Sequence, residues 1–126
     1  MRALPTLALG GAVLAAVAAG TVAARTFQPA GTKAGTIAVS ATDFRFRINP
    51  AVGPRAGQTV TFVVKNNGKV NHDFKIAGKK TRLLRPGQRA RLSVKFTKAG
   101  KYLYICTVDA HRQLGMKGRY TVRPAQ

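Results

Sequence analysis

One short stretch of the chain gathers residue types that bind soft metal ions. Cys106, His111 and Met116 lie there at equal intervals, with four residues between neighbours. The chain has one cysteine and two histidines, so His72 is the remaining imidazole. A thiolate and two imidazoles in a trigonal plane, with a weakly bound thioether above it, form the blue-copper electron-transfer site. The spacing therefore predicts a loop wrapped around one copper ion, with His72 brought in from another segment.

Each donor of this set has a chemical role. The thiolate donates strongly to Cu(II), whereas the soft thioether favours Cu(I), and a site that both oxidation states accept reorganises little on electron transfer. Taken singly, a cysteine, a methionine or a histidine is more often a core or surface residue than a ligand. Their combination at ligand spacing favours a metal site, with His72, Cys106, His111 and Met116 as the ligands.

The elements that must position these ligands are strands. Apolar and polar residues alternate with period two in segments 44–49, 60–64 and 89–96, which is typical of half-buried strands. Combinations of Asn, Gly and Pro mark turns between them. No long helical period follows residue 24, and no internal repeat is present. The pattern predicts an all-β antiparallel sandwich or barrel of about seven to eight strands.

The strand that leads into Cys106 has a defined parity. Alternation puts Tyr102, Tyr104 and Cys106 on one face, and Leu103 and Ile105 on the other. Cys106 then faces inward, as a metal site requires. The tyrosines could serve as electron relays, but we predict that they pack in the core with a partner for the hydroxyl.

The N-terminal residues indicate export. Arg2 is followed by an uncharged run from Ala3 to Ala24 that ends in small residues, as in a secretion signal. The run is also long enough for an uncleaved membrane anchor, although Pro5 and several glycines favour cleavage. We expect residues 1–24 to be the signal peptide or anchor, 25–35 a flexible linker and 36–126 the folded domain. The domain would lie in the periplasm or elsewhere in the extracytoplasmic cell envelope.

The charge balance is extreme. Lys and Arg number 22 against three acids, Asp43, Asp73 and Asp109, which gives a net charge of +19. Charge of this size affects partners and solubility rather than fold. Many basic residues fall in turns or on the outward phase of strands and are best interpreted as a solvated face. We expect an acidic docking surface on a redox partner, or attachment to an anionic membrane or cell wall. Nucleic acid is not expected, because no aromatic stacking platform accompanies the charges.

Two longer motifs resemble a known family. Val70-Asn71-His72-Asp73-Phe74-Lys75-Ile76 and Gly100-Lys101-Tyr102-Leu103-Tyr104-Ile105-Cys106, continued through His111 and Leu114-Gly115-Met116 to Val122, are similar to the cupredoxins. This is the family of plastocyanin, azurin, pseudoazurin and rusticyanin, and the resemblance covers roughly residues 36–122. It implies a Greek-key fold, and ligation through the ring nitrogen of each histidine nearer the backbone. It also implies an electron port at His111, surrounded by Ala110, Leu114, Gly115 and residues 51–53.

Asp73 departs from the family pattern. In cupredoxins the residue after the first histidine is often Asn or Ser and links the two ligand-bearing segments. We therefore expect Asp73 to hydrogen-bond near Thr107 and to orient His72 and Cys106. The alternative is an acid in a surface turn.

Three functions are compatible with these residues. The first is an exported one-electron carrier that acts as a monomer between redox partners. The second is a copper-trafficking or buffering protein of the cell envelope, and the third is a metal-independent binder of anionic envelope polymers. Enzymatic turnover is not expected, because both histidines are already assigned and a single cysteine cannot build a dinuclear copper-A centre.

Overall fold

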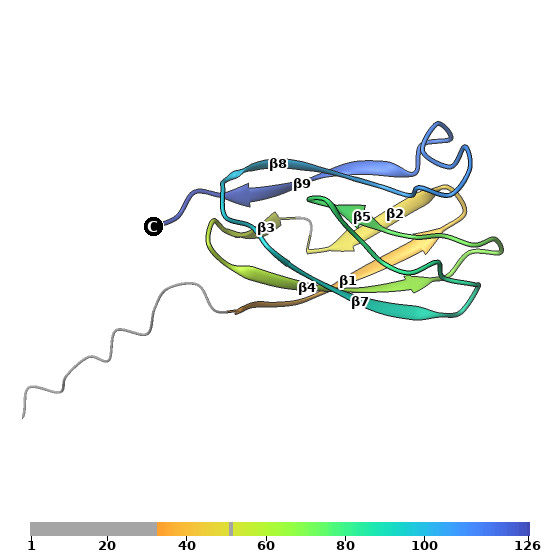
Figure 1. Ribbon diagram of the computed structural model, residues 1–126, viewed down its shortest axis with the longest axis horizontal. Helices are drawn as coiled ribbons and strands as arrows, with labels where there is room; N and C mark the ends of the chain where they lie inside the picture. Colours follow the sequence, from red (N-terminus) through yellow and green to blue (C-terminus); the bar gives the residue numbers. More distant parts are fainter. Residues whose placement is uncertain (1–32, 51) are drawn as a thin grey trace, which may run out of the picture.

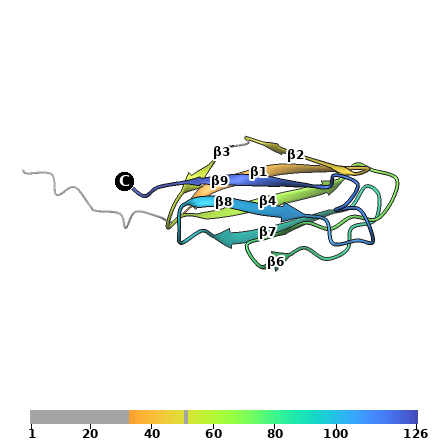
Figure 2. The same cartoon turned by 90° about the horizontal axis from the view of Figure 1, so that it is seen from above.

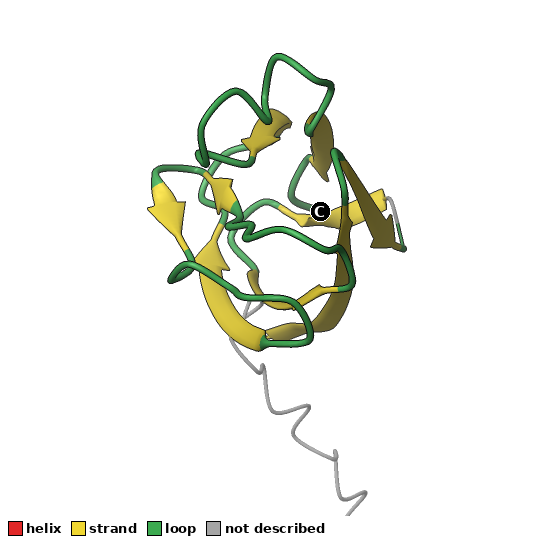
Figure 3. Ribbon diagram, turned by 90° about the vertical axis from the view of Figure 1, so that its right-hand side faces the viewer, coloured by secondary structure: helices red, strands yellow, loops and turns green. Residues whose placement is uncertain are grey.

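Nine strands and the loops between them make up the part of the chain described by the computed structural model, residues 33–50 and 52–126 (Figure 1). These residues include no helix, and hence none that could cross a bilayer (Figure 3). The segment 1–24, predicted to be a signal or anchor, lies outside them, as do residues 25–32. The strands are β1 (Lys33–Thr42), β2 (Arg45–Asn49), β3 (Val52–Arg55), β4 (Thr59–Asn66), β5 (Lys75–Ile76), β6 (Lys79–Lys80), β7 (Arg89–Lys95), β8 (Gly100–Ile105) and β9 (Lys117–Arg123).

The strands form two sheets. One has the order β2-β1-β4-β7 and the other β3-β9-β8-β5-β6 (Figure 2). The predicted all-β architecture is confirmed, and the two short strands β5 and β6 bring the number to nine. Both sheets are mixed rather than purely antiparallel, since β1 pairs parallel to β4 and β3 parallel to β9. Alternation reveals which face of a strand is buried but carries no information on strand direction.

The sheet includes three residues that precede the expected boundary at Thr36. Strand β1 starts at Lys33, which pairs with Thr59 of β4. Residues 33–35 of the predicted linker therefore belong to the sheet. The sequence did not predict this part of the strand, because it lacks apolar alternation. Gly35, with φ +95°, interrupts the strand register next to Lys33.

The core forms where the buried faces of the two sheets meet. Strand β4 buries Val60, Phe62 and Val64 completely. The Phe62 ring packs on Phe74 at 5.4 Å and on Tyr120 of the opposite sheet, also at 5.4 Å. Such aromatic contacts add to the stabilisation from burial.

The two tyrosines of β8 pack in the core as predicted, and Tyr102 also has the predicted hydroxyl partner. Tyr104 contacts Phe46 and Phe74, with ring centroids 5.8 and 5.6 Å apart. Tyr102 packs on Phe96 and donates its hydroxyl proton to the carbonyl of Lys98 at 2.5 Å. Both rings therefore serve the core.

Three loops meet at one end of the sandwich. The loop from β8 to β9, the β1–β2 turn and the segment after β4 gather on the right of Figure 1, and Figure 3 faces this end. The C-terminus and β3 lie at the other end. Cys106 follows β8 and Met116 precedes β9, so these two antiparallel strands place both residues at the same end of the sandwich.

Candidate metal centre

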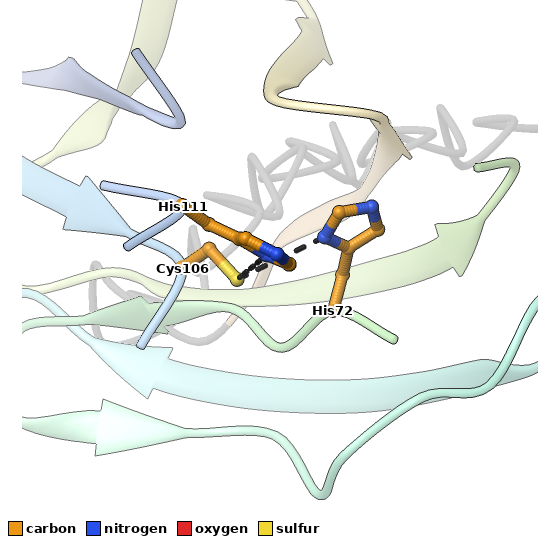
Figure 4. A group of neighbouring side chains, drawn as sticks. All are labelled: His72, Cys106 and His111. Carbon is orange, nitrogen blue, oxygen red and sulfur yellow. Dashed lines mark hydrogen bonds between the residues drawn. The ribbon is translucent and has the colours of Figure 1, made fainter. Parts of the chain in front are cut away.

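Three of the four predicted ligands come together at this end of the sandwich. Cys106 directly follows β8, His111 lies in the loop to β9, and His72 lies before β5. The Cys106 Sγ atom is 3.9 Å from Nδ1 of His72 and 3.6 Å from Nδ1 of His111 (Figure 4). All three donor atoms lie within 4.8 Å of one another and all three residues are buried.

These distances suit one shared metal ion. Bonds of about 2.0 Å to imidazole nitrogen and about 2.3 Å to thiolate sulfur, typical of a borderline-soft divalent ion, would place N and S about 3.7 Å apart at a trigonal angle. The two observed distances, 3.9 and 3.6 Å, bracket this value. The nitrogen nearer the backbone faces the sulfur in both histidines, as the resemblance implied.

Met116 closes the loop beside these ligands. Its backbone N–H donates to the carbonyl of His111 at 3.0 Å, and its carbonyl accepts from the N–H of Cys106 at 3.1 Å. The residue is completely buried. The loop is thus tied at both ends, with a thioether-bearing residue at its closing point. The role of Met116 as the fourth ligand stays a prediction.

Asp73 links the two ligand-bearing segments, as expected. Its carboxylate accepts the N–H of Thr107 at 2.6 Å and also the Thr107 hydroxyl proton. Asp73 follows His72 and Thr107 follows Cys106, so one side chain fixes the spacing of both ligands. With 4% of its surface exposed, Asp73 is buried, and the alternative of a surface turn acid is wrong.

Asp43 is a second carboxylate at the site, and the sequence did not reveal it. It lies in the β1–β2 turn, where its Oδ1 contacts Nε2 of His72 at 2.9 Å and both carboxylate oxygens accept the N–H of Lys69 at 3.0 Å. The hydrogen bond from His72, followed by that from the Lys69 amide, lowers the pKa of Asp43. A carboxylate can only accept, so Nε2 of His72 must donate, and the Nδ1 lone pair is left facing Cys106.

Gly68 leaves room for this contact. A Cβ atom at this position would lie 2.2 Å from Oδ1 of Asp43 and 2.9 Å from Nε2 of His72. No side chain fits there without displacing one of the two groups. The only signals in the sequence were the scarcity of acids and an Asn-Asn-Gly run, which was interpreted as a turn.

Phe44 covers the same site and differs from the sequence-based expectation. Its alternation with Arg45 predicted a strand residue, but it lies in the turn with φ +69°. The ring packs edge-on against His111 with centroids 4.9 Å apart, and lies 6.4 Å from the His72 ring. The β1–β2 turn therefore touches both imidazoles through consecutive residues.

Burial sets the protonation of the thiol. Desolvation raises the pKa of Cys106, with smaller opposing effects from backbone hydrogen bonds. In the metal-free protein the thiol is therefore protonated at neutral pH. Metal binding must release this proton, because the thiolate is the ligand.

Three of the residues predicted to surround His111 are exposed, in the same loop as the exposed Arg112. Leu114 is 59% exposed, and Ala110 and Gly115 are exposed beside it. Gly53 does not contribute, because it packs against Thr121 and Tyr120, towards the far end of β9. Ala51 of the same predicted set lies outside the described residues. Parallel pairing with β9 carries β3 away from the loops. Leu114 and Phe44 instead border an open hollow of about 620 Å³ that Arg45 and Arg47 also line.

Comparison with known proteins gives matches of sequence and of fold. Residues 33–123 match the sequence profile of the copper binding proteins of the plastocyanin/azurin family. Two relatives are named copper-resistant cuproprotein CopI. The one from Pseudomonas aeruginosa is 26% identical over 124 residues, covering 59% of this chain and 68% of its own. The one from Rubrivivax gelatinosus is 29% identical over 100 residues, covering 61% of this chain and 60% of its own, so the chain spans less than two thirds of it.

Solved structures share the fold. Auracyanin from Roseiflexus castenholzii superimposes with a TM-score of 0.60 at 18% identity, over 76% of this chain and 100% of its own. Auracyanin A from Chloroflexus aurantiacus, described as a blue copper protein, has a TM-score of 0.60 at 24% identity, over 74% of this chain and 100% of its own. The sandwich that places the three donors is thus shared with these proteins.

Proposed function

Since the chain belongs to the plastocyanin/azurin family of copper-binding proteins, we propose that it is a one-electron carrier whose type 1 copper is held by His72, Cys106, His111 and Met116. The observation that carries the proposal is the buried cluster of one sulfur and two nitrogen donors at 3.6 and 3.9 Å. Full burial and two backbone hydrogen bonds support Met116 as the fourth residue that would hold the copper. Copper bound there supplies the one-electron chemistry.

The surrounding residues favour rapid electron exchange over metal exchange. Asp43 fixes the His72 ring, and Asp73 fixes the backbone next to Cys106. Ligands held in this way change position little between oxidation states, so little reorganisation opposes electron transfer. Burial of the cluster also keeps water and external ligands away.

His111 is proposed to be the electron port. It is 8% exposed and lies beside the exposed side chains of Ala110 and Leu114, which offer a partner a dry contact. The net charge of +19 favours a partner with an acidic docking surface, because opposite charge accelerates encounter. We propose export to the periplasm or cell envelope from the pattern of residues 1–24, and a monomeric carrier without catalytic turnover.

Copper handling is the second candidate, and one observation favours it. Both sequence relatives carry the name copper-resistant cuproprotein. A protein of this kind could store or deliver copper through the same ligands. The two functions differ in whether the metal leaves during the cycle.

Repeated oxidation and reduction with a Cu(I) chelator present separates the two. The copper-loaded protein is cycled with a chemical oxidant and reductant, and its visible absorbance and copper content are followed. A carrier regains its full absorbance after each cycle, whereas a delivery protein loses copper to the chelator on reduction.

Met116→Leu is expected to raise the reduction potential, because the remaining ligands stabilise Cu(II) less. An unchanged potential would remove Met116 from the ligand set.

A further inference from the structure

The outer face of the sheet β2-β1-β4-β7 is basic from edge to edge. Burial alternates along each strand, so the residues between the buried ones face outward. None of the four strands contains an acidic residue. The cationic side chains of this face are Arg45 and Arg47 on β2, Lys65 on β4, and Arg89, Arg91 and Lys95 on β7.

Strand register places three of these cations in one row. Arg47 pairs with Ser40, Ser40 with Lys65, and Lys65 with Arg89, so the row crosses all four strands. Lys65 and Arg89 stand directly opposite each other, an arrangement that destabilises a sheet when the charges are alike. Within residues 33–50 and 52–126 the only ion pair joins Asp43 and His72. No carboxylate there neutralises the row.

The middle of the row is hollow. The small residues Ala38, Ser40 and Val63 leave a depression of about 250 Å³, with Lys65 and Arg89 also among its lining residues. Cationic side chains therefore line a depression in the outer surface of the sheet. The large exposed apolar side chains, Val70, Leu83, Leu103 and Leu114, all lie outside these four strands. The four strands of this face therefore carry no apolar wedge of the kind that interfacial membrane binders insert into lipid, and exposed Leu114 lies only at the β2 edge, beside Arg45 and Arg47.

We propose that this face binds a linear phosphodiester polyanion without bases, of the glycerol-phosphate kind, which lies along the row and neutralises Lys65 and Arg89. Neighbouring strands are about 5 Å apart, and residues that face outward along one strand are about 7 Å apart. The cations of this face are therefore spaced on the scale of one charge per monomer unit of a polymer. The guanidinium groups of Arg47 and Arg89 can each hold a phosphate through two parallel N–H donors. The row contains no metal ligand, so the binding is independent of the copper site.

The experiment tests whether binding of the oligomer depends on where the basic residues lie or only on how many there are. The full chain is titrated with a fluorescent glycerol-phosphate oligomer of about ten units at several salt concentrations. Lys65→Gln/Arg89→Gln removes two charges from the row, while the control Lys101→Gln/Arg119→Gln removes two exposed charges from the other sheet. Each lost phosphate contact reduces the slope of log affinity against log salt by about 0.7. The row variant should lose about 1.4 in slope and roughly tenfold or more in affinity at low salt, and the control far less.

Thermal unfolding without the oligomer checks the premise and the fold of each variant. The row variant should melt higher than the unsubstituted chain at low salt, because the like-charged pair is gone, and the melting temperature of the control should rise less, since it loses only general repulsion. Equal losses of oligomer binding in both variants would show a net-charge effect and overturn the proposal, as would a lower melting temperature of the row variant. Tighter binding, per charge, to phosphatidylglycerol vesicles than to the oligomer would assign the face to a membrane and overturn it too.

Discussion

Two carboxylates hold the metal end of the sandwich, and they do so from different environments. Asp73 is buried, follows a ligand in the chain and binds the backbone beside another ligand. Asp43 keeps 29% of its side chain exposed, comes from a distant turn and binds the ring of His72 itself. The difference separates two tasks. Asp73 joins segments and should matter for folding, whereas Asp43 orients one imidazole and should matter for the metal.

Replacing the buried carboxylate should have the largest effect on stability. Asp73→Ala removes two hydrogen bonds to a charged acceptor and leaves the Thr107 N–H without its partner. We expect the metal-free domain to lose about 2 to 3 kcal/mol of unfolding free energy, measured in urea. Asp109→Asn, which removes the same charge from the loop, is the control. A loss no larger than that of the control would deny Asp73 its linking role.

Replacing the exposed carboxylate should weaken metal binding more than folding. Asp43→Asn keeps the shape but removes the charge that fixes the donor nitrogen of His72. Copper affinity should fall about 10-fold to 100-fold, as for other groups that orient metal-bound histidines, with a smaller loss of stability than in Asp73→Ala. Competition with a copper chelator measures the affinity. An affinity equal to that of Asp109→Asn would contradict this role.

Adding one methyl group at Gly68 should imitate loss of the Asp43 contact. The Cβ of Gly68→Ala would lie 2.2 Å from Oδ1 of Asp43, so the carboxylate must move away from His72. Copper affinity should fall in the same direction as in Asp43→Asn. The double variant should be little worse than either single variant, because both remove one interaction. Additive losses would show that Gly68 acts on something else.

Tyr120 provides a reference for burial without hydrogen bonds and should show the smallest effect. Its hydroxyl is the one buried side-chain polar atom without a hydrogen-bond partner in the described residues. Tyr120→Phe should therefore leave stability at neutral pH unchanged or raise it by about 1 kcal/mol, unlike Asp73→Ala.

The same residue predicts an alkaline loss of stability. Burial raises the pKa of Tyr120 from 10.0 to about 12, so the folded state holds the phenol proton more tightly than the unfolded state. Its stabilising contribution is full below pH 10 and is lost as the pH rises towards 12. Urea unfolding at pH 8 and at pH 11 should show a smaller decrease for Tyr120→Phe. Equal decreases would place the titrating group elsewhere.

The sequence predicted the parts of the site that are local along the chain. Cys106 and His111 share one loop, and Asp73 adjoins His72, so spacing and motif were enough to predict them. Met116 lies in the same loop, and its role as a ligand stays a prediction. Asp43 and Gly68 could not be found in this way, because their contacts with His72 depend on how three loops meet at the end of the sandwich. Phe44 lies in a turn instead of a strand because of a positive φ that alternation does not encode. Parallel pairing of β3 with β9, which takes Gly53 away from His111, is likewise a property of topology.

The visible spectrum after addition of Cu(II) to the purified metal-free protein tests the copper site itself. A type 1 site with Cys106 as ligand gives an intense thiolate-to-copper charge-transfer band at one copper ion per chain, and Cys106→Ser should lose it. Asp43→Asn should keep the band but need more copper to develop it. A colourless unsubstituted protein, or a band that survives Cys106→Ser, would contradict the account.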